Sequence, residues 1–351
     1  MPRPGDTDNN ENGNTDFAEG ADFADVSVWI RPIRVIRVVS VLFLHQWESA
    51  MSLSSGRPAD FDEYWNAVQA ELAALPIAAE LTHLPLQSNE HSTVYAARFT
   101  GVGPYRLYAW FSVPTNGDGP FPTVYQLPGY GSVVHVPAYE LRQRYVVLAL
   151  RHRGQRLSDQ PYAAAYPGLL TDGIDNPATY IYRGIVADCL RGMDFLLSRP
   201  EVDTKRIALT GNDLALMTAA LRPQATGLHC SPGLLYNAAS LAPKTSAYPL
   251  EELNDYTRAY PDRAGQMADT LRYFDPIHFA DRVGCETLLV TGSERDFLSP
   301  AVLAPLAERI VGPLTPYESA HSSYRDGVQQ AEWLSSHFGY SDTLLPAQWQ
   351  A

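Results

Sequence analysis

The sequence has few cysteines, and none of them is spaced for chemistry. Cys189, Cys230 and Cys285 are odd in number, lie inside apolar segments and form no CxxC or zinc-type pattern. This arrangement favours buried thiols in a reducing compartment over disulfides, a zinc site or a cysteine nucleophile. We therefore expect neither a bound metal nor a cofactor.

Basic residues are also scarce relative to acidic ones. The chain has 26 Lys and Arg against 39 Asp and Glu, which gives a formal net charge of −13 and a pI near 5.1. Nucleic acids and anionic membranes require a basic footprint, so the composition argues against both as partners. A small-molecule substrate is the partner that we expect.

No uncharged apolar run is long enough to span a membrane. The most apolar stretch, residues 26–47, is interrupted by Arg31, Arg34 and Arg37, and Pro32 would break a helix there. The acidic segment before it has the wrong order for a signal peptide, and no small-residue cleavage site follows. We therefore expect neither a transmembrane helix nor export, and a cytoplasmic location.

The rest of the composition predicts a large folded domain. Apolar residues make up 45% of the chain and aromatic residues 11%, which is ample for a core. We expect an acidic, irregular extension over 1–50, one domain over 51–343 and a short tail over 344–351. The extension is either a real appendage or upstream sequence before a start at Met51. Residues 240–275 are polar and read as an irregular lid-like insertion.

Strand and helix patterns alternate along the domain. The segments 92–101 and 105–114 alternate apolar and polar residues and predict an antiparallel pair, while 179–198 has the clearest helical periodicity. Short apolar runs near 121–127, 145–151, 206–211, 227–232 and 286–292 predict further strands. Strands alternating with helices indicate an α/β fold whose mostly parallel sheet is covered by helices on both faces.

The main question about the chemistry of this protein concerns residues 208–221, "ALTGNDLALMTAAL". This segment reads as a strand, a turn and a helix, the setting of a Gly-x-Ser-x-Gly nucleophile elbow, but Asp213 stands where serine would be and Ala215 where the last glycine would be. A later strand ends in "GSERD" and the last segment in "ESAHSSY", which contain Asp296 and His321. The order nucleophile, acid, histidine is typical of α/β-hydrolases. His135 and His229 carry no assigned role.

Several longer stretches resemble a known family, the acetyl xylan esterases and cephalosporin C deacetylases of carbohydrate esterase family seven. They cover about residues 57–340: "PADFDEYW", "PGYG", "RHRGQ", "TYIYRGIVADCLRGMDFL", "PEVDTKRIALTGND", "FDPIHFADRV", "GSERDFLSP" and "SAHSSY". The resemblance implies an α/β-hydrolase fold, a deacetylase-like activity, a substrate such as an acetylated sugar, and a homo-oligomer, a hexamer in the family.

The resemblance also implies site residues. Asp213 falls on the serine nucleophile, Asp296 on the acid of the catalytic triad and His321 on its base. The backbone N–H groups of Tyr130 and Leu214 fall on the oxyanion hole. Two further residues, Arg153 and Gln155, fall on the motif that braces the loops around the site. The glutamine and glycine that usually follow the serine are replaced by Leu214 and Ala215.

An aspartate at residue 213 leaves the chemistry open. A carboxylate is a poor nucleophile for an ester carbonyl, because the adduct expels carboxylate more readily than alkoxide. It can attack a saturated carbon, as in haloalkane dehalogenases and epoxide hydrolases, although those enzymes commonly have tryptophan where this chain has Leu214. Other readings are an ion pair of Asp213 with His321 in a disabled site, or either residue acting as a general base on water.

Three functions therefore remain from the sequence. The first is an acetyl-ester hydrolase with an atypical triad, Asp213, Asp296 and His321. The second is a hydrolase with an aspartate nucleophile that acts at saturated carbon. The third is a non-catalytic binding or assembly protein.

Overall fold

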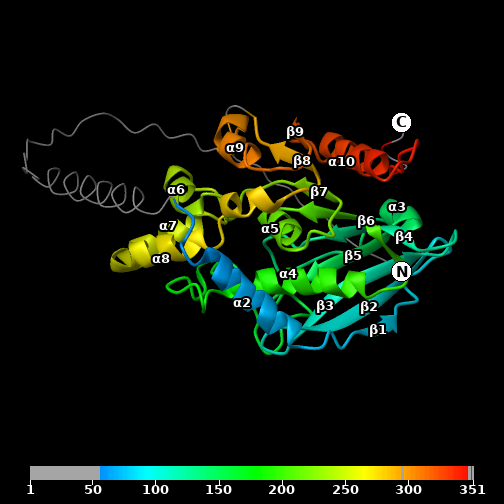
Figure 1. Cartoon of the computed structure of the whole chain (residues 1–351), viewed down its shortest axis with the longest axis horizontal. Coiled ribbons are helices and arrows are strands. Elements are labelled where there is room, and N and C mark those ends of the chain that lie inside the picture. The colour runs from blue at the N-terminus through cyan, green and yellow to red at the C-terminus, as the bar shows by residue number, and fades with distance from the viewer. Residues whose placement is uncertain (1–55, 294–295, 347–348, 350–351) are drawn as a thin grey trace, which may run out of the picture. The chain divides into compact units, whose positions relative to one another are not determined.

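Nine strands form a single sheet in residues 56–293, 296–346 and 349, the part of the chain that the computed structural model describes. They follow one another in the order β1-β2-β3-β5-β4-β6-β7-β8-β9 (Figure 1). The pairs among β1, β2, β3 and β5 are antiparallel, and all neighbouring pairs from β5 to β9 are parallel. Their bounds are β1 (Glu80–His83), β2 (Ser92–Gly101), β3 (Tyr105–Pro114), β4 (Phe121–Gln126), β5 (Val146–Arg151), β6 (Val202–Gly211), β7 (Gly227–Cys230), β8 (Glu286–Thr291) and β9 (Leu314–Glu318).

Helices cover both faces of this sheet (Figure 1). One apolar cluster joins the sheet to α2 (Phe61–Ala73), α4 (Ile181–Leu197), α5 (Asp213–Leu221) and α9 (Pro300–Ala307). A second cluster on the other face includes Trp333, Leu334 and Phe338 from around α10 (Ser323–His337), with α3 (Tyr139–Arg144) beside it. Every residue of α5 is buried, because the sheet lies on one side of this helix and other apolar elements surround it. Burial on both faces explains why the parallel strands read as continuous apolar runs.

The remaining elements lie between β7 and β8 or near α4. They are α6 (Ala238–Leu241), α7 (Glu251–Ala259), α8 (Ala264–Arg272), and the short 3-10 turns Leu169–Thr171, Ala242–Lys244, Pro261–Arg263, Pro276–His278 and Ala280–Arg282.

The α/β-hydrolase-type architecture predicted from the sequence is confirmed, and several elements match residue by residue. The strands β2 and β3 have the predicted bounds, and α4 lies within the predicted 179–198. The prediction that 240–275 is irregular is wrong, because α7 and α8 form there. Glu251 and Glu252 lie in the first turn of α7 and Arg258 lies in its last turn, an arrangement that suits the helix dipole. The predicted extension over 1–50 lies outside the described residues.

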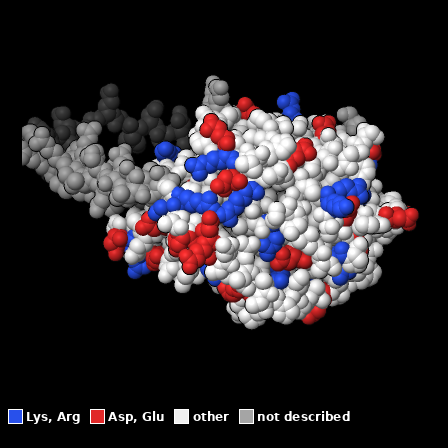
Figure 2. Space-filling model, viewed as in Figure 1, with Lys and Arg blue, Asp and Glu red and all other residues white. Residues whose placement is uncertain are grey.

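Charges of both signs are mixed on the surface. Figure 2 shows Lys and Arg side chains lying beside Asp and Glu side chains on the face in view. The ion pairs include Arg183 with Glu71 at 2.6 Å and Arg222 with Asp194 at 2.7 Å.

Candidate active site

The corner at residues 208–221 joins strand β6 to helix α5. The strand ends at Gly211 and the helix begins at Asp213, so Asn212 is the residue before the helix. The Asn212 side chain caps α5, because its Oδ1 accepts the N–H of Leu214 at 3.0 Å. An oxyanion hole needs free donors, and the Leu214 N–H that was predicted for this role already has an acceptor.

The carboxylate of Asp213 is buried and bonded to the chain that follows β7. None of the residue is exposed (0%). One of its oxygens accepts the N–H groups of Gly233 at 3.0 Å and Leu234 at 2.8 Å, and the other accepts that of Tyr236 at 2.9 Å. Burial raises the pKa of Asp213, and the backbone donors oppose that rise. These hydrogen bonds therefore connect the start of α5 to residues 233–236.

The backbone at Asp213 does not show the left-handed strain that can mark a nucleophile elbow. In such an elbow the attacking residue lies on a sharp, strained turn. The non-glycine residues with positive φ in the described ranges are Ala78, Leu157, Asn237 and His321, and Asp213 is not among them. Asp213 is here the first residue of a capped helix.

Asp296 and His321, the predicted acid and base, lie in contact. The distance from Nε2 of His321 to Oδ2 of Asp296 is 2.7 Å. The N–H of Ser293, with smaller contributions from its hydroxyl and from His321, lowers the pKa of Asp296, which keeps the carboxylate ionised at neutral pH. The His321 side chain is 60% exposed, and its Nδ1 has no hydrogen-bond partner among the described residues. The imidazole therefore has one oriented nitrogen and one free nitrogen.

The loop that carries His321 is strained and held by a residue that the sequence reasoning missed. His321 has a φ of 51°, which is uncommon for a non-glycine residue and is often found at functional positions. Asp326 accepts hydrogen bonds from Tyr317 at 2.7 Å, from the Ser319 hydroxyl at 2.8 Å and from the Ala320 N–H at 2.8 Å. Its signal in the sequence was an aspartate five residues after the candidate histidine, at the start of a helix.

Asp296 lies against Gly292 at the end of β8. A Cβ atom on Gly292 would be 2.6 Å from the Cβ of Asp296 and 2.8 Å from its Oδ2, closer than side chains approach one another. Only glycine therefore allows the carboxylate to occupy its present position.

Asp213 is not joined to the Asp296–His321 pair. The described residues contain no hydrogen bond or ion pair between Asp213 and His321, since the Asp213 oxygens contact the N–H groups of 233–236 and His321 contacts Asp296. The predicted ion pair of a disabled site is accordingly absent from this structure.

The Asp296–His321 pair opens on a cavity of about 350 Å³, here called the histidine cavity. Its lining residues follow β7, β8 and β9: Ser231, Pro232, Val290, Thr291, Gly292, Asp296, Phe297, Leu298, Ser319 and His321. Asp213, Leu214 and Tyr130 do not line it. Three lining residues carry hydroxyls: Ser319 bonds Asp326, Thr291 is buried, and Ser231 is exposed without a side-chain hydrogen bond in the described ranges. Ser231 follows a different strand from Asp213, so the nucleophile-elbow pattern does not point to it.

The loop around Tyr130 is braced by Gln155. The buried amide of Gln155 donates to the carbonyls of Gly129 at 3.1 Å and Gly131 at 2.6 Å and accepts the N–H of His152 at 3.0 Å. The Tyr130 N–H, the other predicted oxyanion donor, has no acceptor among the described residues. The Tyr130 hydroxyl donates to the buried Glu252.

Arg153, the other predicted bracing residue, is held inside the fold by Asp188 of helix α4. Its guanidinium forms a two-point pair with the fully buried Asp188, at 2.9 Å from Nε and 2.7 Å from Nη2. Burial acts to lower the pKa of Arg153, but Asp188 outweighs it and raises the pKa. A Cβ on Gly184 would be 2.5 Å from this guanidinium, so helix α4 approaches it closely only because that residue is glycine.

The described residues hold no group of three or more His, Cys, Asp or Glu that could bind a metal ion. Cys189, Cys230 and Cys285 are free thiols. Within the same ranges, no helix is both long and apolar enough to cross a membrane.

Comparison with known proteins agrees with this architecture. The model of the acetyl xylan esterase (AXE1) family matches residues 42–308. The acetyl esterase Axe7A of Xylanibacter ruminicola is 23% identical over 298 residues, and the match spans 79% of this chain and 66% of that protein's length.

Two solved structures share the fold. The acetyl xylan esterase from Paenibacillus sp. R4 has a TM-score of 0.69 at 22% identity, with 82% of this chain and 98% of that chain covered. Acetyl xylan esterase 1 from Thermoanaerobacterium sp. JW/SL YS485 has a TM-score of 0.69 at 21% identity, with 83% and 98% covered. Since the family match covers most of the chain, this protein belongs to the acetyl xylan esterase family and is an α/β-hydrolase.

Proposed function

We propose that the protein hydrolyses small carboxylic esters, acetylated sugars among them, with His321 as the general base and Ser231 as the attacking hydroxyl. The observation that carries the proposal is that the Asp296–His321 pair and the exposed Ser231 line one cavity. The names of the family and its relatives favour acetyl groups as the acyl part.

The proposed roles follow the chemistry of each group. The Nε2 of His321 contacts Asp296, so Nδ1 is the nitrogen left to accept a proton, the reverse of the nitrogen use in serine-protease triads. Ser231 Oγ would attack the acyl carbon and give its proton to Nδ1. The alkoxide would leave with that proton, and water activated in the same way would release the acyl group.

The chain order supports Ser231 as well. Ser231, Asp296 and His321 keep the order nucleophile, acid, histidine, with the nucleophile moved from the end of β6 to the end of β7. Asp213 is a weaker candidate, because its carboxylate is buried and accepts three N–H groups. The same burial opposes attack by Asp213 at a saturated carbon.

Covalent labelling tests the nucleophile. We expect a fluorophosphonate probe to add to Ser231, as mapped by tandem mass spectrometry of the digested protein. Labelling should be lost in Ser231→Ala and kept in Ser336→Ala, which removes an exposed hydroxyl from α10, and in Asp213→Asn. A label on Asp213, or acetate release that continues in Ser231→Ala, would contradict the role of Ser231. No acetate release from p-nitrophenyl acetate by the wild type would contradict the function itself.

The close approach at Gly292 gives a second test. We expect Gly292→Ala to displace Asp296 and to lower kcat for p-nitrophenyl acetate by about tenfold with little change in KM, because the acid orients the base rather than binding substrate. The control is Gly265→Ala on α8, where an added Cβ meets no atom within 4 Å. Equal kcat values in the two variants would show that the position of Asp296 is unimportant.

A further inference from the structure

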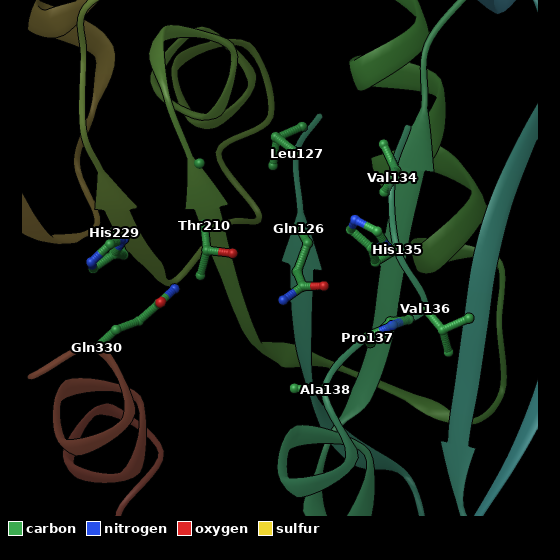
Figure 3. A pocket seen from close by; sticks show the side chains of 11 residues that line it. Gln126, Leu127, Val134, His135, Val136, Pro137, Ala138, Thr210, His229 and Gln330 are labelled. Atoms are coloured by element: carbon green, nitrogen blue, oxygen red, sulfur yellow. The ribbon is translucent and has the colours of Figure 1, made fainter. Parts of the chain in front are cut away.

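A second cavity, here called the polar cavity, lies beside the corner that precedes Asp213. It has a volume of about 490 Å³ and is lined by Gln126, Leu127, Val134, His135, Val136, Pro137, Ala138, Thr210, Gly211, His229 and Gln330 (Figure 3). Its volume is within the range of small-molecule sites. None of these residues lines the histidine cavity.

Three polar side chains of the polar cavity form a row across the sheet. Gln126 on β4 pairs in register with Thr210 on β6, and Thr210 pairs with His229 on β7. Residues paired in this way point to the same face of a sheet. Figure 3 shows Gln330 of α10 reaching toward this row from the helix that covers the face.

This polar row interrupts a face that is otherwise apolar. Two residues earlier on the same strands, Val124 and Ala208 pack in the apolar cluster with Trp333 and Phe338. Helix α3 begins only at Tyr139, so the segment 132–138 passes the row without forming a helix over it. The hollow therefore arises where polar residues replace apolar ones and helix α3 does not extend over them.

Among the described residues, most polar groups of the row lack a hydrogen-bond partner. Thr210 is only 5% exposed, yet its hydroxyl makes no hydrogen bond to any described residue. The side chains of Gln126 and Gln330 likewise make no hydrogen bond to a described residue, and the His229 imidazole is bonded only to its own backbone. A buried polar group without a partner is costly, which makes such a group aimed into a cavity a sign of a ligand or ordered water.

The charged-type side chains of the polar cavity are limited to two histidines, His135 and His229. No Asp, Glu, Lys or Arg lines it. Burial lowers the pKa of His229 to about 4, so its imidazole is neutral near pH 7. An ionic ligand would lose its hydration here without gaining a counter-charge. Hydroxyl groups, by contrast, both donate and accept, as amide, imidazole and threonine side chains require.

We propose that the polar cavity binds a small, uncharged, hydroxyl-rich molecule, with Thr210, Gln126, His229 and Gln330 as its hydrogen-bond partners. The apolar wall of Leu127, Val136 and Pro137 would contact the C–H groups of such a molecule. This site is independent of the proposed esterase chemistry, because the two cavities share no lining residue.

Matched sugars test the proposal on the full chain. We expect saturation-transfer NMR and calorimetry to detect D-glucose with a Kd of about 1 mM, and glucosamine and glucuronate, its cationic and anionic counterparts, to bind at least about tenfold more weakly. Thr210→Val, which removes only the hydroxyl, should weaken glucose binding by about three- to tenfold. Gln330→Met on α10 should do the same and guards against a folding defect at the buried Thr210.

The controls separate this site from the histidine cavity. Thr315→Val on the exposed part of β9 and Ser231→Ala should bind glucose like the wild type. Absence of glucose binding, equal binding of the three sugars, or unchanged binding in both Thr210→Val and Gln330→Met would overturn the proposal. None of these outcomes depends on esterase activity.

Discussion

Replacing His321 by alanine is expected to lower kcat/KM for p-nitrophenyl acetate by about 10³-fold, the usual contribution of a general base. The loss should appear in kcat and leave KM nearly unchanged, because the imidazole moves a proton in the transition state and does not hold the ester. The reason lies in the geometry, since the Nε2 of His321 is held by Asp296 and its Nδ1 makes no hydrogen bond to another described residue.

Chemical rescue sharpens this prediction. The His321 side chain is 60% exposed, so its removal should leave room for free imidazole, which should restore part of the activity. His83→Ala serves as the control, because His83 is an exposed histidine on β1, at the opposite edge of the sheet from β9. An active His321→Ala variant, or one that imidazole does not rescue, would contradict the role of His321 as the base.

Replacing Asp213 by alanine is expected to lower the free energy of unfolding by about 3–5 kcal/mol, since three N–H donors in the interior lose their acceptor. Those donors belong to Gly233, Leu234 and Tyr236. Urea unfolding followed by circular dichroism measures the change. Asp262→Ala is the matched control: this exposed aspartate makes no side-chain hydrogen bond in the described chain, and its loss should change stability by less than about 0.5 kcal/mol.

The pH dependence of Asp213→Asn adds a second readout. The pKa of Asp213 is raised, so its contribution to stability is fully present below its unfolded pKa and is lost as pH rises through its folded pKa. The asparagine cannot ionise, and it should therefore flatten this fall relative to the wild type.

Because Asp213 is not the attacking group in the proposed mechanism, folded Asp213→Asn and Asp213→Ser should keep the wild-type rate. Loss of activity in a folded Asp213→Asn variant would instead make Asp213 the nucleophile.

Much of the fold could be predicted because its strands are buried on both faces. Continuous apolar runs marked β4 to β8, and the turn at residues 101–104 fixed the bounds of β2 and β3. Strand β9 and helices α7 and α8 were not predicted, because they are short, partly exposed and rich in polar residues.

The candidate site could be predicted only in part. The positions of Asp296 and His321 follow from strand ends and motif order, and the structure joins them. The burial of Asp213 could not be predicted, because it depends on N–H groups of residues 233–236, which the chain reaches only after crossing to β7. The same crossing brings Ser231 to the histidine cavity. The order of the motifs along the sequence cannot show which strand end supplies a hydroxyl that is free of hydrogen bonds.

The hydrogen bonds made by Asp213 also affect how the sheet folds. These bonds join residues only 20 to 23 positions apart in sequence. Parallel neighbours such as β6 and β7 can pair only after the intervening crossover has formed, which makes them slow to meet. A buried acceptor at the start of the crossover helix closes this β-α-β unit through local contacts, at a small loop-closure entropy. Asp213, which the sequence motif places where a nucleophile would be, thus stabilises β6, α5 and β7 as one folding unit at the centre of the sheet.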